Sequence, residues 1–148
     1  MIITVDFETY YDREFSLSKM TTEEYIRSDS FEVIGVGVKV DAQETTWFTG
    51  TKEQTQEFLN QYDWANALVL AHNTAFDGAI LSWHFGVEPK GWLDTLCMAR
   101  ATHGVDVGAS LAFLAEKYEL GKKGTEVVNA MGKRRSDFAS EEMERYGA

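Results

Sequence analysis

The spacing of apolar residues along the chain predicts five strands separated by helices. A β-branched apolar run begins at Ile2 and continues to Thr9, which is typical of a core strand. Residues 67–71 are apolar throughout, as expected of a parallel strand that is buried on both faces. The predicted strands are 2–9, 31–40, 44–49, 67–71 and 92–94, and the predicted helices are 21–27, 51–62, 75–85, 96–102, 111–118 and one that begins at residue 140.

The order of these elements predicts an α/β fold. A short turn joins strands 31–40 and 44–49, which favours antiparallel pairing at the start of the chain. The later strands alternate with helices, which favours parallel pairing with crossover helices. The fold class is therefore α/β: a mixed sheet, three antiparallel strands and then parallel strands, flanked by helices. At 148 residues we expect a single domain, 1–148.

Local signals predict where individual elements begin and which faces they bury. Thr21 and Glu24 have the spacing of a capping box, and Thr74 is predicted to cap the helix that begins at Ala75. In strand 31–40 the alternation places Ile34 on the same face as the valines at 36, 38 and 40. The glycines at 35 and 37 fall on the opposite face, where we expect another element to approach closely.

The first strand carries two carboxylates at its end. Asp6 and Glu8 are separated by one residue and so point to the same side, roughly 6–7 Å apart. On the face of a core strand, two like charges need a cation between them or a raised pKa. A divalent metal ion resolves the conflict, because hard cations prefer oxygen ligands. A strand end that reaches water is the alternative, since carboxylates there need no partner.

Asp77 is the candidate for a third ligand. It lies in the first turn of the helix that follows strand 67–71, at the carboxyl edge of the sheet where α/β proteins bind ligands. An ordinary solvated aspartate at a helix start is the alternative. His72 and Asn73 follow at the end of this strand. The alternative for His72 is an ordinary core histidine, and the alternative for Asn73 is an asparagine that pairs with the backbone.

Net charge bears on the class of partner. The chain carries a formal charge of −10, which argues against binding to a phosphate backbone. The charge is uneven, however, because residues 122–135 hold five basic side chains against Glu126 alone. This segment is predicted to be a loop, either simply solvated or in contact with nucleic acid. Its basic residues are Lys122, Lys123, Lys133, Arg134 and Arg135.

These residues together resemble the DEDD 3′–5′ exonucleases. Asp6-Phe7-Glu8-Thr9 is similar to their first motif, and His72-Asn73-Thr74-Ala75-Phe76-Asp77 to their second, in the form found in the proofreading domain of family A DNA polymerases, including phage enzymes. Trp92-Leu93-Asp94-Thr95 resembles the strand that commonly follows. The resemblance spans nearly the whole chain and implies the RNase H-like fold.

The resemblance implies a two-metal hydrolysis of the terminal phosphodiester at a DNA 3′ end, with Mg²⁺ or Mn²⁺ held by Asp6, Glu8 and Asp77. By the same resemblance Asn73 and Thr9, with the backbone of Phe7, position the terminal nucleotide. His72 belongs to the same motif and is counted with these substrate-binding residues. Phe76 and residues of the 10–20 loop stack on frayed bases.

The family has a fourth carboxylate on a late helix, preceded by a tyrosine in the form Y-x-x-x-D. Tyr146 is the candidate for this tyrosine, which would orient the attacking water, and the aspartate would then fall just past residue 148. We therefore expect residues 1–148 to be the N-terminal fragment of a longer polymerase, with the polymerase domain in the same or a partner chain. Two alternatives stay open: an exoribonuclease of the same superfamily, and a catalytically silent module that binds DNA or a polymerase.

The sequence also bears on location. It holds no apolar run long enough to span a membrane, and Met1 leads straight into the first strand without a signal peptide. Cys97 is the only cysteine, which fits a reducing compartment. We expect no membrane partner and a cytoplasmic location in a bacterial or phage-infected cell.

Overall fold

The computed structural model describes residues 1–121 and 130–147, and its elements follow the predicted order. The strands are β1 (Ile2–Thr9), β2 (Val33–Val40), β3 (Thr46–Phe48), β4 (Leu68–Ala71) and β5 (Gly91–Asp94). The helices are α1 (Thr22–Arg27), α2 (Lys52–Asn60), α3 (Thr74–Phe85), α4 (Thr95–His103), α5 (Leu111–Lys117) and α7 (Ser140–Gly147), with 3₁₀ turns η1 (Trp64–Asn66) and η2 (Arg135–Asp137).

The five strands form one mixed sheet in the order β3-β2-β1-β4-β5. β1 lies at its centre, antiparallel to β2 and parallel to β4, while β5 continues the parallel half beside β4. The predicted mixed α/β architecture is therefore confirmed. Because β1 and β4 are parallel neighbours, the carboxyl end of β1 lies beside the β4–α3 connection.

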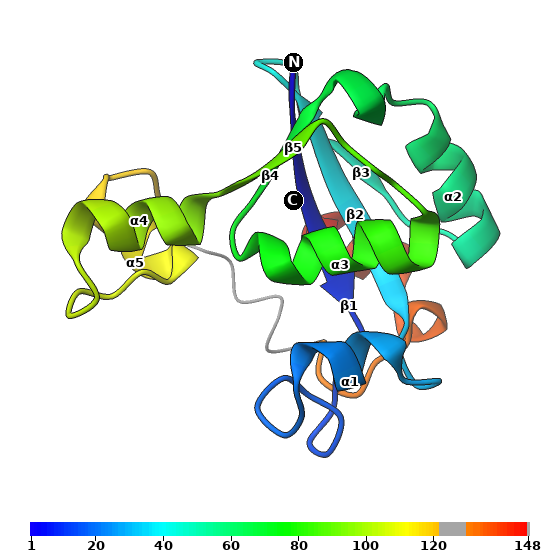
Figure 1. The fold of residues 1–148 in the computed structure, drawn as a ribbon. Helices are drawn as coiled ribbons and strands as arrows, with labels where there is room; N and C mark the ends of the chain where they lie inside the picture. The colour runs from blue at the N-terminus through cyan, green and yellow to red at the C-terminus, as the bar shows by residue number, and fades with distance from the viewer. Residues whose placement is uncertain (122–129, 148) are drawn as a thin grey trace.

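The two faces of the sheet are covered by different helices. The larger core lies on one face, where Ile3, Val5 and Phe7 of β1 meet Ile80 and Leu81 of α3. On the other face α7 packs against β2, and Met143 and Tyr146 bury a smaller cluster there. Figure 1 shows α3 in front of the sheet, the C-terminal helix behind it, and α4 with α5 to one side. Within the described residues, none of the helices combines the length and the apolar character needed to cross a membrane.

One residue of β2 departs from the predicted face. Glu8 pairs with Gly35 whereas Thr9 pairs with Val33, so Ile34 is an extra residue in the ladder. A bulge of this kind turns its side chain to the opposite face. Ile34 therefore packs with Met143 and Tyr146 and not with the valines of β2, and the prediction that it shares their face was wrong.

The glycines of β2 permit the close approach that was predicted, at one of the two positions. A Cβ on Gly35 would lie 2.3 Å from the indole ring of Trp47, whereas one on Gly37 would meet only ordinary contacts. The same indole also excludes a Cβ at Gly147, at 2.2 Å. Trp47 is thus packed between β2 and the end of α7, and its ring lies edge-on to Tyr146 with 6.4 Å between the ring centroids.

Helix starts follow the sequence signals with one exception. Thr21 and Glu24 form the predicted capping box. The cap predicted at Thr74 was wrong, because Thr74 is the first residue of α3 and its hydroxyl donates to the carbonyls of Ala71 and Leu93. The N-cap position is occupied by Asn73, whose φ of 71° lies in the left-handed region and whose side chain makes no cap hydrogen bond.

Candidate active site

The two carboxylates of β1 occupy the less buried face of the central strand. Phe7 between them is 4% exposed, while Asp6 is exposed and Glu8 is half-buried. The alternation that was predicted from the sequence is therefore confirmed for this strand. The charges of both side chains act on Asp77, so the strand end is an electrostatically coupled position.

Asp77 reaches β1 from α3. Its Oδ1 accepts a hydrogen bond of 2.9 Å from the backbone amide of Phe7, between the two carboxylates of the strand. The side chain is 3% exposed, and this burial raises the pKa of Asp77 to about 8, with the negative charges of Asp6 and Glu8 adding to the shift. The charges of Asp6 and Glu8 therefore act on Asp77 at the carboxyl end of β1.

Tyr146 of α7 completes the cluster from the opposite face. Its hydroxyl donates a hydrogen bond of 2.9 Å to Glu8 Oε2, although 138 positions separate the two residues. Burial, the charge of Glu8 and this hydrogen bond together raise the pKa of Tyr146, so the hydroxyl stays protonated and remains a donor. The tyrosine picked out by the motif spacing thus contacts one of the predicted metal ligands.

A cavity of about 310 Å³ opens directly beside Glu8 and Tyr146. Three residues predicted to bind substrate lie in its wall: Phe7, Thr9 and Phe76. The 10–20 loop contributes Tyr11, Ser16 and Leu17 to the same wall. Thr9 also shares a hydrogen bond of 2.8 Å with the hydroxyl of Tyr25, whose ring forms another part of the wall. The wall of this cavity is mostly apolar, with Glu8 as an acidic group at its side.

His72 and Asn73 are placed differently, since they lie at the β4–α3 junction and not in the wall of this cavity. His72 Nδ1 is 2.9 Å from the hydroxyl of Thr95. The amide of Asn73 donates to the carboxylate of Asp94. Their contacts are thus with the start of α4.

Asp94 is a site residue that the sequence reasoning did not single out. Its carboxylate accepts hydrogen bonds from the amides of Asn73 (3.0 Å), Thr74 (3.1 Å) and Leu96 (2.9 Å). Burial alone would raise the pKa of Asp94, but these amides lower it below its ordinary value. Asp94 thereby joins the starts of α3 and α4 and fixes the turn that carries Asp77. The sequence position of Asp94 could have indicated this role, because an aspartate directly before a helix is a strong N-cap.

The predicted basic segment is only partly described, since Lys122 and Lys123 lie outside the described residues. The remaining three lie in the described residues, where 130–134 form turn and coil as predicted and the short turn η2 begins at Arg135. Lys133 forms an ion pair with Glu142 at 3.1 Å, and Arg134 forms one with Glu32 at 3.2 Å. These two side chains are therefore engaged within the protein.

The donor set fits a hard divalent cation. All the candidate ligands are carboxylate oxygens, and the raised pKa of Asp77 marks a buried acid that bound positive charge would ionise. Within residues 1–121 and 130–147, however, no three acidic, histidine or cysteine side chains are grouped so that they could hold a metal ion. In this arrangement Asp77 accepts from the Phe7 amide and Glu8 accepts from Tyr146.

The fold and these residues define an RNase H-like α/β domain of the exonuclease type. A family model described as 3′–5′ exonuclease matches residues 21–148, and the chain belongs to that family. β1, with Asp6 and Glu8, precedes the matched residues. No curated protein gives a significant match.

Among solved structures, Brucella melitensis NrnC with bound Mg²⁺ is similar, with a TM-score of 0.66 and 11% sequence identity. The similarity covers 99% of this chain and 64% of that chain, so this chain spans less than two thirds of the NrnC length. A second NrnC structure gives a TM-score of 0.67 at 11% identity over 99% of this chain and 65% of that one. At this identity the likeness concerns the fold, and it includes β1.

Proposed function

We propose that this protein is a metal-dependent 3′–5′ exonuclease that removes nucleotides from DNA 3′ ends, as in proofreading. The observation that carries the proposal is the coupling of groups from three elements: the charges of Asp6 and Glu8 on β1 act on Asp77 of α3, and the hydroxyl of Tyr146 on α7 donates to Glu8. A domain of the 3′–5′ exonuclease family with these groups at one sheet edge is equipped to hydrolyse a phosphodiester.

In this proposal Asp6, Glu8 and Asp77 hold Mg²⁺ or Mn²⁺, two ions per site once a fourth carboxylate is present. Such ions would supply Lewis acidity and a more acidic water at the scissile phosphate. Tyr146, kept protonated by its environment, orients the attacking water together with Glu8. Phosphodiester hydrolysis at the last linkage then releases a nucleoside 5′-monophosphate and a shortened strand.

The cavity beside Glu8 supports the assignment of the substrate side. Its wall of Phe7, Phe76 and Leu17 offers apolar surface to the terminal base, and stacking of this kind tolerates any sequence. In the proposal this cavity holds the frayed 3′ nucleotide, while a polymerase domain in the same or a partner chain supplies the mismatched end. Asn73, which lies with His72 at the neighbouring β4–α3 junction, would help to position the same terminal nucleotide. Lys122, Lys123 and Arg135 would contact the backbone.

The experiment is a digestion of 5′-labelled single-stranded DNA with Mg²⁺ or Mn²⁺. We expect a ladder shortened one nucleotide at a time from the 3′ end, and we expect Asp6→Ala and Asp77→Ala to abolish it while the protein stays folded. Wild-type digestion by Asp6→Ala would show that the metal assignment is wrong. Absence of both cleavage and metal binding in the unaltered protein would favour the silent module.

An exoribonuclease is the second candidate, because it would use the same carboxylates. Matched ribo- and deoxyribo-oligonucleotides separate the two, since the difference lies in tolerance of the 2′-hydroxyl. Thr9 and Tyr25, whose hydroxyls pair with each other in the cavity wall, are among the polar groups that would lie beside a nucleotide there. Preferred digestion of RNA would replace the DNA assignment and leave the catalytic residues unchanged.

A further inference from the structure

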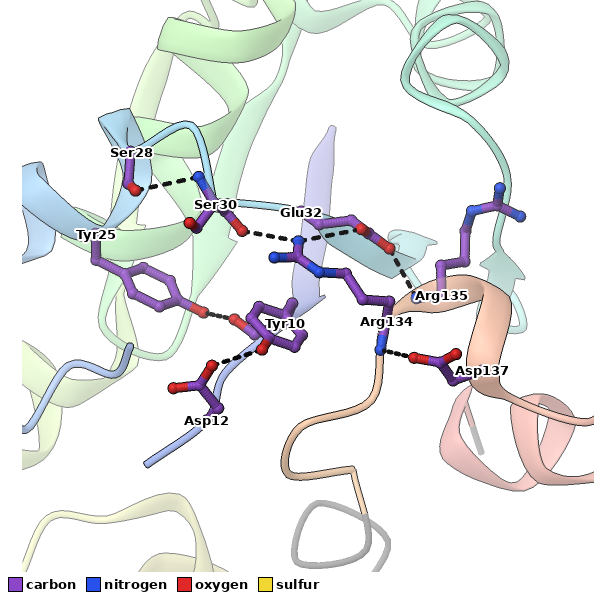
Figure 2. Close-up of polar contacts among 9 residues, drawn as sticks. All are labelled: Tyr10, Asp12, Tyr25, Ser28, Ser30, Glu32, Arg134, Arg135 and Asp137. Atoms are coloured by element: carbon purple, nitrogen blue, oxygen red, sulfur yellow. Dashed lines mark hydrogen bonds and ion pairs between the residues drawn. The ribbon is translucent and has the colours of Figure 1, made fainter. Parts of the chain in front are cut away.

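The C-terminal segment, residues 130–147, carries Tyr146 and is attached to the domain by one arginine in particular. The guanidinium of Arg134 lies over the ring of Tyr10, 3.8 Å from its centroid. Its Nη1 donates to the carbonyl of Ser30 at 2.9 Å and to Glu32 Oε2 at 3.2 Å. Figure 2 shows Arg134 reaching across from the C-terminal segment to these groups, which come from the strand end at Tyr10 and the turn before β2.

Glu32 accepts hydrogen bonds from two adjacent residues of the C-terminal segment. While its Oε2 accepts from Arg134, its Oε1 accepts from the backbone amide of Arg135 at 2.7 Å. The amide of Arg134 donates in turn to Asp137 at 2.8 Å, within the turn η2 (Figure 2). Both the side chain and the backbone at this point are thus fixed, and charge-assisted bonds of this kind are the stronger ones in proteins.

Tyr10, on which Arg134 stacks, is itself hydrogen-bonded to a residue in the wall of the cavity. Tyr10, under the guanidinium, donates to Asp12 at 2.5 Å, and its carbonyl accepts from the hydroxyl of Tyr25 (Figure 2). Tyr25 and the neighbouring Tyr11 form part of the cavity wall. The carbonyl of Tyr11 also accepts from the amide of Gly132, at 2.7 Å. Arg134 therefore joins the segment that carries Tyr146 to the loop that bounds the cavity.

We propose that Arg134 is a positioning residue, which holds the C-terminal segment so that the hydroxyl of Tyr146 meets Glu8. This inference rests on the proposed function for its catalytic consequence, and it assigns Arg134 a role other than contact with nucleic acid. The Arg134 and Glu32 side chains are 37% and 31% exposed, and the guanidinium is stacked on one side and hydrogen-bonded at its edge. Its Nη1 donates to the protein at the place where the segment must be held.

The first test measures hydrogen exchange of the α7 amides in the full chain, without metal or substrate. Arg134→Gln is expected to lower the protection of α7 by about tenfold, the factor that corresponds to about 1.4 kcal/mol, and to leave the amides of β1 and β4 unchanged. Glu32→Gln, which alters the partner of Arg134, should lower α7 protection by a similar factor. Arg134→Lys, which keeps the charge but loses the planar fork, should restore protection only in part.

Arg27→Gln is the matched control. Arg27 also stacks on an aromatic ring, Trp83 at 4.1 Å, and also pairs with a glutamate, Glu23 at 3.1 Å, but it lies on α1 and these two partners belong to α3 and α1. Its substitution should leave α7 protection unchanged. Because the exchange measurement needs no catalysis, the positioning role can fail while the proposed function stands, and the reverse holds too.

The second test is a kinetic cycle with Tyr146→Phe. If Arg134 acts through Tyr146, Arg134→Gln lowers kcat with little change in KM, and it adds little once Tyr146 has been replaced. Unchanged α7 protection in both Arg134→Gln and Glu32→Gln would overturn the proposal. A raised KM with a weaker salt dependence and an unchanged kcat would also overturn it, because that is the signature of a lost phosphate contact.

Discussion

The backbone amide of Phe7 donates a hydrogen bond of 2.9 Å to the buried carboxylate of Asp77. This bond ties the central strand to α3 at the point where the side chains of Asp6 and Glu8 leave the sheet. It also gives Asp77 a partner that favours the charged form, while burial and the two neighbouring carboxylates oppose that form. The Asp77 carboxyl group is consequently held in one orientation, and its ionisation is unfavourable until a cation binds beside it.

Asp77 should make the metal-free protein less stable as the pH rises. Its pKa is about 8 in the folded state, against an ordinary value of 3.8, so the folded state holds the proton more tightly than the unfolded state does. The favourable contribution is complete below pH 4 and is lost as the pH rises through 8. Asp77→Asn, which cannot ionise, should raise the free energy of unfolding at pH 8.5 by about 1–3 kcal/mol. Urea unfolding from pH 5 to 8.5 in chelator measures this, and an unchanged slope in the variant would contradict it.

Binding of Mg²⁺ or Mn²⁺ should release a proton from the same residue. A bound cation favours the ionised form, so the pKa of Asp77 falls and the proton leaves. Calorimetric titration at pH 7 in two buffers of different ionisation enthalpy measures the number of protons released. The unfolding free energy should also rise, by about 2.7 kcal/mol at a metal concentration of 100 times Kd. Asp77→Asn should bind more weakly and release no proton, and equal release by both proteins would exclude Asp77 as the source.

Replacing Tyr146 by Phe should affect catalysis more than folding. The change leaves the ring packed against Trp47 and Phe138 but removes the hydroxyl that donates to Glu8. We expect kcat to fall by up to about 10²-fold, the scale of a single positioned acid–base group. Tyr118→Phe is the control, since it removes a hydroxyl that contacts His103 on an exposed surface. Equal activity in the two variants would remove Tyr146 from the mechanism.

Asp94→Ala should loosen the turn that presents Asp77. The substitution leaves the amides of Asn73, Thr74 and Leu96 without their acceptor, and loss of an N-cap alone costs about 1 kcal/mol. Hydrogen exchange should speed up at the first turns of α3 and α4, and metal affinity should fall. Asp63→Ala, which removes an exposed carboxylate paired with the Asn66 side chain, is the control. Unchanged exchange at Thr74 would show that Asp94 has no such role.

The order and type of the elements could be predicted from the sequence because each depends on neighbouring residues. The alternation in β1, the apolar run of β4 and the capping box at Thr21 are local signals, and the structure has each of them where it was expected. The candidate site residues were also recognisable, because the D-x-E spacing puts two carboxylates on one face and the start of α3 puts Asp77 near the sheet edge. These features follow from the periods of strand and helix alone.

The remaining features depend on contacts between segments that are distant in the sequence. The bulge that turns Ile34 to the opposite face follows from its register against Glu8 and Thr9, and the junction at Asp94 follows from the packing of β5 beside β4. The acidic residues that could take part in catalysis were recognisable from the sequence alone. The contacts of Tyr146 with Glu8 and of Arg134 with Glu32 form only in the folded chain. Each joins residues more than 100 positions apart, and no local period encodes such a contact.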